Sequence, residues 1–162
     1  MTFPSRLRWL GLTLFIALAD RITKALIESR TTEGWHHELV HNFLYLVHSR
    51  NPGIAFSMFA DSHSPYLKTG LIAVSVLFIA VLAWLLVTSA SLTWRSLAGL
   101  ALLIGGAAGN LTDRIVHGAV TDFFEIWFGS YRYPAFNVAD SAITVGAVLV
   151  LLDVLFSSPK ER

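Results

Sequence analysis

The sequence contains no cysteine, which excludes disulfides, thiolate metal ligands and a cysteine nucleophile. Charge is also scarce, because only 14% of the residues are Asp, Glu, Lys or Arg, against about 25% in an average soluble domain. The formal net charge of +1 is too small to indicate a nucleic-acid partner. A phosphate-binding Gly-rich string ending in Lys-Ser/Thr is missing, and no Ser-His-Asp set is evident.

Long apolar runs are what the sequence has instead, with 54% hydrophobic residues overall. A helix needs roughly 20 apolar residues to cross a bilayer. Four stretches meet this requirement and are predicted to span a membrane: residues 9–27, 69–90, 96–112 and 137–156. They predict a single integral membrane domain over residues 1–162.

Of the connecting segments, 28–68 is the longest polar stretch of the chain, and 113–136 is rich in aromatics. Segment 28–68 contains the β-prone run Phe43–Val47 and the turn signal Asn51-Pro-Gly53. Segment 113–136 is interpreted as an aromatic loop at the bilayer interface. The expected fold is an all-α membrane protein, a four-transmembrane-helix bundle with a small β-rich extracytoplasmic element.

The first apolar run has an alternative interpretation. Arg6 and Arg8 before it and the small-residue triplet Ala17-Leu-Ala19 after it resemble a cleavable secretory signal peptide. However, Asp20 and Lys24 continue the helical spacing beyond the triplet. We therefore expect this segment to remain as a helix of the bundle.

Four spans place both chain ends on one side of the membrane. The basic residues of that side would be Arg6, Arg8, Arg95, Lys160 and Arg162. Because positive residues favour the cytoplasm, both ends are predicted to be cytoplasmic and segments 28–68 and 113–136 to face outward.

This topology brings eight polar residues together near the outer interface. They are Asp20, Lys24, Asn51, Asn110, Asp113, Arg114, Asp122 and Asp140. Ionisable groups in or beside hydrocarbon are expensive and indicate a functional site. Asp122 and Asp140 are interpreted as a carboxylate pair at the mouth of the bundle.

Two carboxylates that share a site do not easily ionise together, so one keeps its proton while the other acts as a base. Such a pair can activate water for hydrolysis. A proton- or cation-coupled transporter remains an alternative, although the groups gather at one surface rather than at the midplane. In a third interpretation, Asp20–Lys24 and Asp113–Arg114 are ion pairs that only anchor the helices.

No chemical role is predicted for several other residues. His37 and His41 have a four-residue spacing, but they lack an acidic third ligand and lie in a strand-like segment, so no metal site is predicted. Asp153 lies about 220° around its helix from Asp140 and is expected to be a solvated end charge. Gly105 and Gly109 form a G-x-x-x-G pattern, which lets helices approach closely.

Five blocks of the chain resemble the lipoprotein signal peptidase (signal peptidase II) family and occur in that family's order. They are Asp20-Arg-Ile-Thr-Lys24, Asn51-Pro-Gly-Ile-Ala-Phe-Ser57, Gly109-Asn-Leu-Thr-Asp-Arg114, Val120-Thr-Asp-Phe123 and Phe136-Asn-Val-Ala-Asp140. The Gly-x-Gly-Asp motif of presenilin-type proteases is missing. The resemblance implies a bacterial inner-membrane aspartyl endopeptidase that cleaves diacylglyceryl-modified prolipoproteins before the lipidated cysteine.

The resemblance also implies roles for single residues. Asp122 and Asp140 match the catalytic dyad. The supporting and substrate-binding positions are Asp20, Lys24, Asn51, Asn110, Asp113, Arg114 and Asn137. No cofactor or metal is expected, and the expected partners are lipidated prolipoproteins, membrane lipids and globomycin-type inhibitors, with the protein acting as a monomer.

Overall fold

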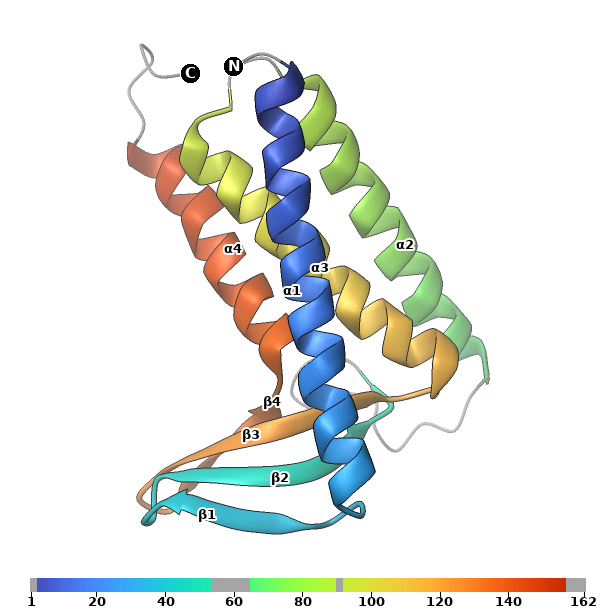
Figure 1. Cartoon of the computed structure of the whole chain (residues 1–162), viewed down its shortest axis with the longest axis vertical. Coiled ribbons are helices and arrows are strands. Elements are labelled where there is room, and N and C mark those ends of the chain that lie inside the picture. The colour runs from blue at the N-terminus through green and yellow to red at the C-terminus, as the bar shows by residue number, and fades with distance from the viewer. Residues whose placement is uncertain (1–2, 54–64, 90–91, 157–162) are drawn as a thin grey trace.

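The computed structural model describes residues 3–53, 65–89 and 92–156. Within these ranges the chain forms four helices and one four-stranded sheet (Figure 1). The helices are α1 (Phe3–Arg30), α2 (Pro65–Thr88), α3 (Trp94–Val116) and α4 (Val138–Phe156). The strands are β1 (His36–Val40), β2 (Leu44–Asn51), β3 (Val120–Phe128) and β4 (Tyr131–Phe136).

The sheet is antiparallel, with the strands in the order β1-β2-β3-β4. It lies across the end of the bundle at which α1 and α3 end and α2 and α4 begin (Figure 1). The prediction of a small β element in segment 28–68 is confirmed by β1 and β2. The interpretation of residues 113–136 as a loop is wrong, because β3 and β4 occupy most of them. Both faces of β3 are covered at Val120–Phe123, and this burial hides the alternation that marks a strand in sequence.

The helices are longer than the predicted spans at several ends, as in α1, which begins at Phe3 rather than at residue 9. By length and apolar composition, two described helical segments can cross a membrane, Lys68–Thr88 and Val138–Phe156. Helices α1 and α3 carry several charged residues in their sheet-proximal halves, which lowers their mean hydropathy. The count of four spans therefore stays a prediction.

Helix α3 is the centre of the bundle. Leu97, Leu100, Leu103 and Ile104 of α3 pack with Leu82 and Leu86 of α2 in the buried core. On another face, small residues of α3 let its neighbours approach closely. A Cβ atom on Gly105 would lie 2.8 Å from the backbone oxygen of Thr13, and one on Gly109 would lie 2.5 Å from Oδ2 of Asp20. The close-approach prediction for these glycines is thus confirmed, with α1 as the partner helix.

Asp153 lies near the end of α4 that is far from the sheet, and its predicted solvation is wrong. Only 5% of this residue is exposed. Its carboxylate accepts hydrogen bonds from the hydroxyls of Thr93 (2.7 Å) and Ser96 (2.5 Å), at the start of α3. A buried carboxylate next to a helix N-terminus is stabilised by such donors and by the helix dipole. The spacing within α4 relates Asp153 to Asp140 alone and carries no information about the neighbouring helix α3.

Candidate active site

The two predicted catalytic aspartates come from different elements at the sheet end of the bundle. Asp122 is on β3 and is 3% exposed. Asp140 is in the first turn of α4 and is less deeply buried. Both side chains line one cavity, so the structure brings them together as the sequence predicted.

Asn137 fixes Asp140 at the beginning of α4. The backbone N–H of Asp140 donates to Oδ1 of Asn137 (2.9 Å), and the backbone N–H of Asn137 donates to Oδ2 of Asp140 (3.2 Å). This reciprocal arrangement is a capping box, which satisfies two free N–H groups of the helix N-terminus. The same cap therefore starts the helix and orients the carboxylate.

Three asparagine amides hold the remaining carboxylate oxygens. Nδ2 of Asn110 donates to Oδ1 of Asp140 (2.8 Å). Nδ2 of Asn137 donates to Oδ1 of Asp122 (2.7 Å), and Nδ2 of Asn51 donates to Oδ2 of Asp122 (3.3 Å). Neutral donors orient a carboxylate without supplying the positive charge that would fix its ionisation.

The ionisation of Asp122 reflects this setting. Burial, together with the neighbouring carboxylate of Asp140, raises the pKa of Asp122 to about 7. Burial disfavours the charged form, and a nearby like charge disfavours it further. A carboxyl group with such a pKa can hold its proton at neutral pH and donate it during a reaction.

Beside the dyad lies a cluster of charged side chains centred on Lys24, which is fully buried. Its Nζ lies 2.7 Å from Oδ2 of Asp20 and 2.9 Å from Oδ2 of Asp113, and it donates to Oδ1 of Asn110 (3.0 Å). The predicted Asp20–Lys24 ion pair is thereby confirmed. Because Asn110 also donates to Asp140, this one residue links the charged cluster to the two aspartates.

The predicted Asp113–Arg114 pair is wrong. Asp113 instead bonds Lys24 and, at 3.1 Å, the guanidinium of Arg21. Adjacent residues on a helix point in different directions, so Asp113 faces α1 while Arg114 turns to the cavity. Arg114 donates to the backbone oxygens of Asn110 (3.4 Å) and Gly53 (2.8 Å).

The bond from Arg114 to Gly53 stabilises the turn after β2. The N–H of Gly53 donates to Oδ1 of Asn51 (3.0 Å), which confirms the predicted turn at Asn51-Pro-Gly53. The side-chain oxygen of Asn51 thus accepts from Gly53, while its NH₂ group donates to Asp122. The rest of the predicted block, Ile54 to Ser57, lies outside the described residues, as do His63 and both chain ends.

Three residues of the charged cluster were missed from sequence: Arg21, Glu28 and Thr121. Arg21 bonds Oε2 of Glu28 (2.5 Å), and the Thr121 hydroxyl donates to Oε1 of Glu28 (2.7 Å). Arg21 and Glu28 are seven residues apart, which places them on one face of α1, so helical spacing could have found this pair. Nothing in the local sequence links Thr121 to α1.

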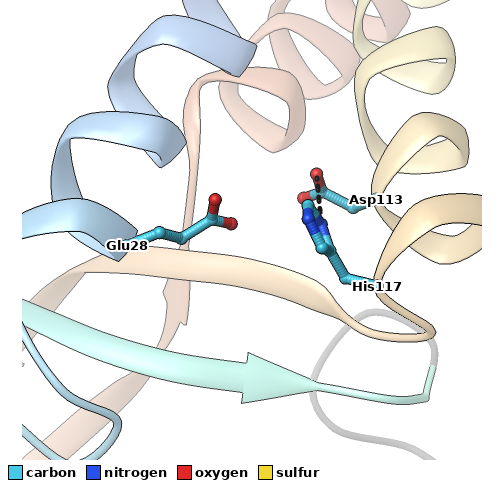
Figure 2. A group of neighbouring side chains, drawn as sticks. All are labelled: Glu28, Asp113 and His117. Atoms are coloured by element: carbon cyan, nitrogen blue, oxygen red, sulfur yellow. Dashed lines mark ion pairs between the residues drawn. The ribbon is translucent and has the colours of Figure 1, made fainter.

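Glu28, Asp113 and His117 lie near one another (Figure 2), and each offers one metal-ligand atom within 4.8 Å of the others. However, Lys24 and Arg21 already bind the carboxylate of Asp113, and Arg21 binds that of Glu28. These donors fit an ion-pair cluster better than a cation site, since two positive side chains lie where a metal would bind. His37 lies on the exposed strand β1, and His41 follows that strand.

The cavity at the dyad has a volume of about 380 Å³. Its polar floor contains Asn51, Asn110, Arg114, Asp122 and Asp140. Its walls are mainly apolar, with Leu71, Val74 and Phe78 from α2, Ile143 from α4 and residues 133–136 of β4. An apolar cleft with a few convergent polar groups is the usual form of a site for a largely apolar ligand.

Comparisons with known proteins cover nearly the whole chain. The family described as signal peptidase (SPase) II matches residues 12–156. The lipoprotein signal peptidase of Solibacter usitatus is 40% identical over 161 residues, covering 96% of this chain and 95% of that protein. The one from Desulforapulum autotrophicum is 44% identical over 147 residues, covering 90% of this chain and 89% of that protein.

Solved structures agree with this result. A structure described as a bacterial membrane enzyme superposes with a TM-score of 0.84 at 25% identity, covering 96% of this chain and 92% of the other. A second one, with the same description, gives a TM-score of 0.81 at 26% identity. These matches indicate an integral membrane enzyme rather than a transporter. The chain belongs to the signal peptidase II family of proteases.

Proposed function

We propose that this protein is an intramembrane aspartyl endopeptidase that removes signal peptides from lipoproteins. Its substrates would be diacylglyceryl-modified prolipoproteins, cut before the lipidated cysteine. The observation that carries the proposal is the environment of Asp122 and Asp140. Both line one cavity and are held by asparagine amides, and within the described part of the chain neither forms an ion pair with a Lys, Arg or His.

This environment suits a pair that holds one proton between two carboxyl groups. Asp122, with its pKa raised to about 7, keeps the proton. Asp140, oriented by the N–H donors of Asn110 and Asn137, takes the role of the base. The two apparent ionisation constants belong to the pair rather than to either residue.

The proposed reaction needs only these two groups and one water molecule. Asp140 takes a proton from the water as its oxygen attacks the peptide carbonyl, while Asp122 gives its proton to the carbonyl oxygen. The tetrahedral intermediate then breaks at the C–N bond. The leaving nitrogen receives the proton from Asp140, and a hydroxyl of the intermediate returns a proton to Asp122, which restores the starting state.

The cavity walls suit a membrane-anchored substrate. The apolar residues of α2, α4 and β4 would receive the acyl chains and the small side chains before the cysteine.

We propose four spans with both chain ends in the cytoplasm and the sheet on the outer face, as the arginine distribution predicts. Reporter fusions at Arg30 and Arg95 test this orientation, and a cytoplasmic signal at Arg30 would contradict it.

The test of the function is cleavage of a lipidated prolipoprotein by the purified protein in lipid. We expect cleavage that survives strong chelators, requires the diacylglyceryl group and is blocked by globomycin. The protein is expected to act as a monomer, so its specific activity should not depend on its concentration. Binding of the lipidated substrate without any cleavage, in several lipids and detergents, would overturn the protease mechanism.

A further inference from the structure

A second cavity lies against the sheet beside Asp122. It has a volume of about 250 Å³ and is lined by Ser49 of β2, Asp122 of β3, and Arg132, Pro134 and Ala135 of β4. Asp122, Pro134 and Ala135 also line the first cavity. The two cavities therefore meet at a catalytic aspartate, and a chain bound in both would pass directly over it.

The two cavities differ in their chemistry. The first is walled largely by apolar residues of the helices. The described lining of the second comes from strands alone, and polar side chains, Ser49, Asp122 and Arg132, make up most of it. A chain that crosses Asp122 would thus pass from apolar to polar surroundings.

The shape of β4 supports an extended chain along this path. β4 is an edge strand, and its register with β3 moves from Phe124–Phe136 to Ile126–Tyr133, which leaves Pro134 and Ala135 opposite Glu125. Such bulges occur next to active sites, where they redirect side chains and end regular pairing. The residues of this bulge are the ones that line both cavities.

Arg132 is held at the second cavity by one edge of its guanidinium. Its Nε and Nη2 lie 2.6 Å and 2.5 Å from Oε2 of Glu125, whose Oε1 accepts from the indole of Trp127 (2.7 Å). Glu125 is 5% exposed, whereas the Arg132 side chain is 58% exposed. The guanidinium is therefore fixed in place while much of it stays accessible to a ligand.

We propose that the second cavity, formed by Ser49 and Arg132 beside Asp122, binds the first residues of the mature lipoprotein, which follow the lipidated cysteine. The inference rests on the proposed function. If the apolar cavity holds the signal peptide and the cleaved bond lies at Asp122, the polar cavity receives the chain beyond that bond. Arg132 then favours an acidic over a basic residue directly after the cysteine.

The test uses three lipidated substrates that differ only in the residue after the cysteine: aspartate, lysine or glycine. For the wild-type protein we expect kcat/KM to be about two- to fivefold higher with aspartate than with lysine, the size typical of a solvent-screened charge pair. Arg132→Gln should bring this ratio to about one, and Arg132→Lys should restore part of it. Arg30→Gln, at an exposed arginine that lines neither cavity, should keep the wild-type ratio.

A second variant leaves the Arg132–Glu125 pair intact, in case its loss disturbs folding. Ser49→Leu should fill the cavity and raise KM for the lysine and aspartate substrates about tenfold more than for the glycine substrate. The matched control is His36→Leu on the exposed strand β1. An unchanged aspartate-to-lysine ratio in Arg132→Gln, or an equal rise in KM for all three substrates in Ser49→Leu, would overturn the subsite. No cleavage by the wild-type protein would instead overturn the proposed function.

Discussion

Two groups of buried carboxylates lie side by side at the sheet end of the bundle, and they differ in their partners. Asp20 and Asp113 share the ammonium of Lys24, at 2.7 Å and 2.9 Å. Asp122 and Asp140 are bonded by asparagine amides instead. A shared cation fixes two carboxylates around it, whereas neutral amides orient a carboxylate without bringing an opposite charge. The first group therefore suits a structural role and the second suits acid–base chemistry.

The structural group also positions the other. Asp20 accepts from the backbone N–H of Ala139 (2.9 Å), next to Asp140, and Lys24 orients the amide of Asn110 by bonding its oxygen. That orientation turns the NH₂ group of Asn110 to Asp140. The charges of α1 thus fix the geometry of a site whose described lining residues come from other elements.

The sharpest test of this comparison makes the same substitution in both groups. Asp122→Asn and Asp140→Asn should each lower kcat/KM by about 10⁴-fold or more, because the reaction needs one charge and one proton. Both variants should fold, since asparagine is nearly isosteric. Cleavage kinetics and thermal unfolding in detergent measure the two effects. Wild-type turnover by either variant would contradict the dyad, and Asp113→Asn is the matched control that should mainly lower stability.

The second prediction concerns the buried cation. Lys24→Met should lower the free energy of unfolding by about 3–5 kcal/mol, because it leaves buried carboxylates without their positive partner. Arg21→Met should cost less, since the Arg21 side chain is 36% exposed and its pairs are partly screened. Reversible unfolding in mild detergent compares the two variants. Equal stability losses would show that burial does not set the strength of these pairs.

The third prediction uses pH. Because the pKa of Asp122 is raised to about 7, its proton is lost above that pH, and kcat/KM should fall about tenfold per unit on the alkaline side. Activity should also fall at acid pH, where the base is protonated.

The raised pKa of Asp122 also affects stability. Its contribution to the free energy of unfolding is fully present below pH 3.8 and is lost as the pH rises to about 7. Asp122→Asn should remove that slope, and a flat activity profile from pH 5 to 9 would contradict the assignment.

Sequence reasoning paired Asp122 with Asp140 because ionisable residues are rare in this apolar chain and because five blocks resemble one family. Asp20 and Lys24 were paired by their helical spacing. The sequence did not predict ion pairs whose two partners lie on different helices or strands. The true partner of Asp113 is Lys24, which Gly105 and Gly109 bring close by letting α1 pack against α3. No spacing within α3 contains that information. Strand β3 was missed for another reason, since burial of both its faces at Val120–Phe123 hides the alternation of a strand.

The smallest effect is expected at Asp153, which tests whether burial alone makes a site. Asp153 is buried like Asp122, but it lies near the other end of α4 and is bonded by the hydroxyls of Thr93 and Ser96, which start α3. It lines neither of the two cavities at the dyad.

Asp153→Asn keeps the shape of the side chain and loses its charge, which the N-terminus of α3 favours. We expect a loss of about 1–2 kcal/mol in the free energy of unfolding, measured by thermal or chemical unfolding, with kcat/KM unchanged. Thr93→Ala, which removes one donor and the cap of α3, should give a loss of similar size. If Asp153→Asn instead lowered cleavage without changing stability, the two ends of α4 would be coupled, and the division between a structural and a catalytic aspartate on one helix would be wrong.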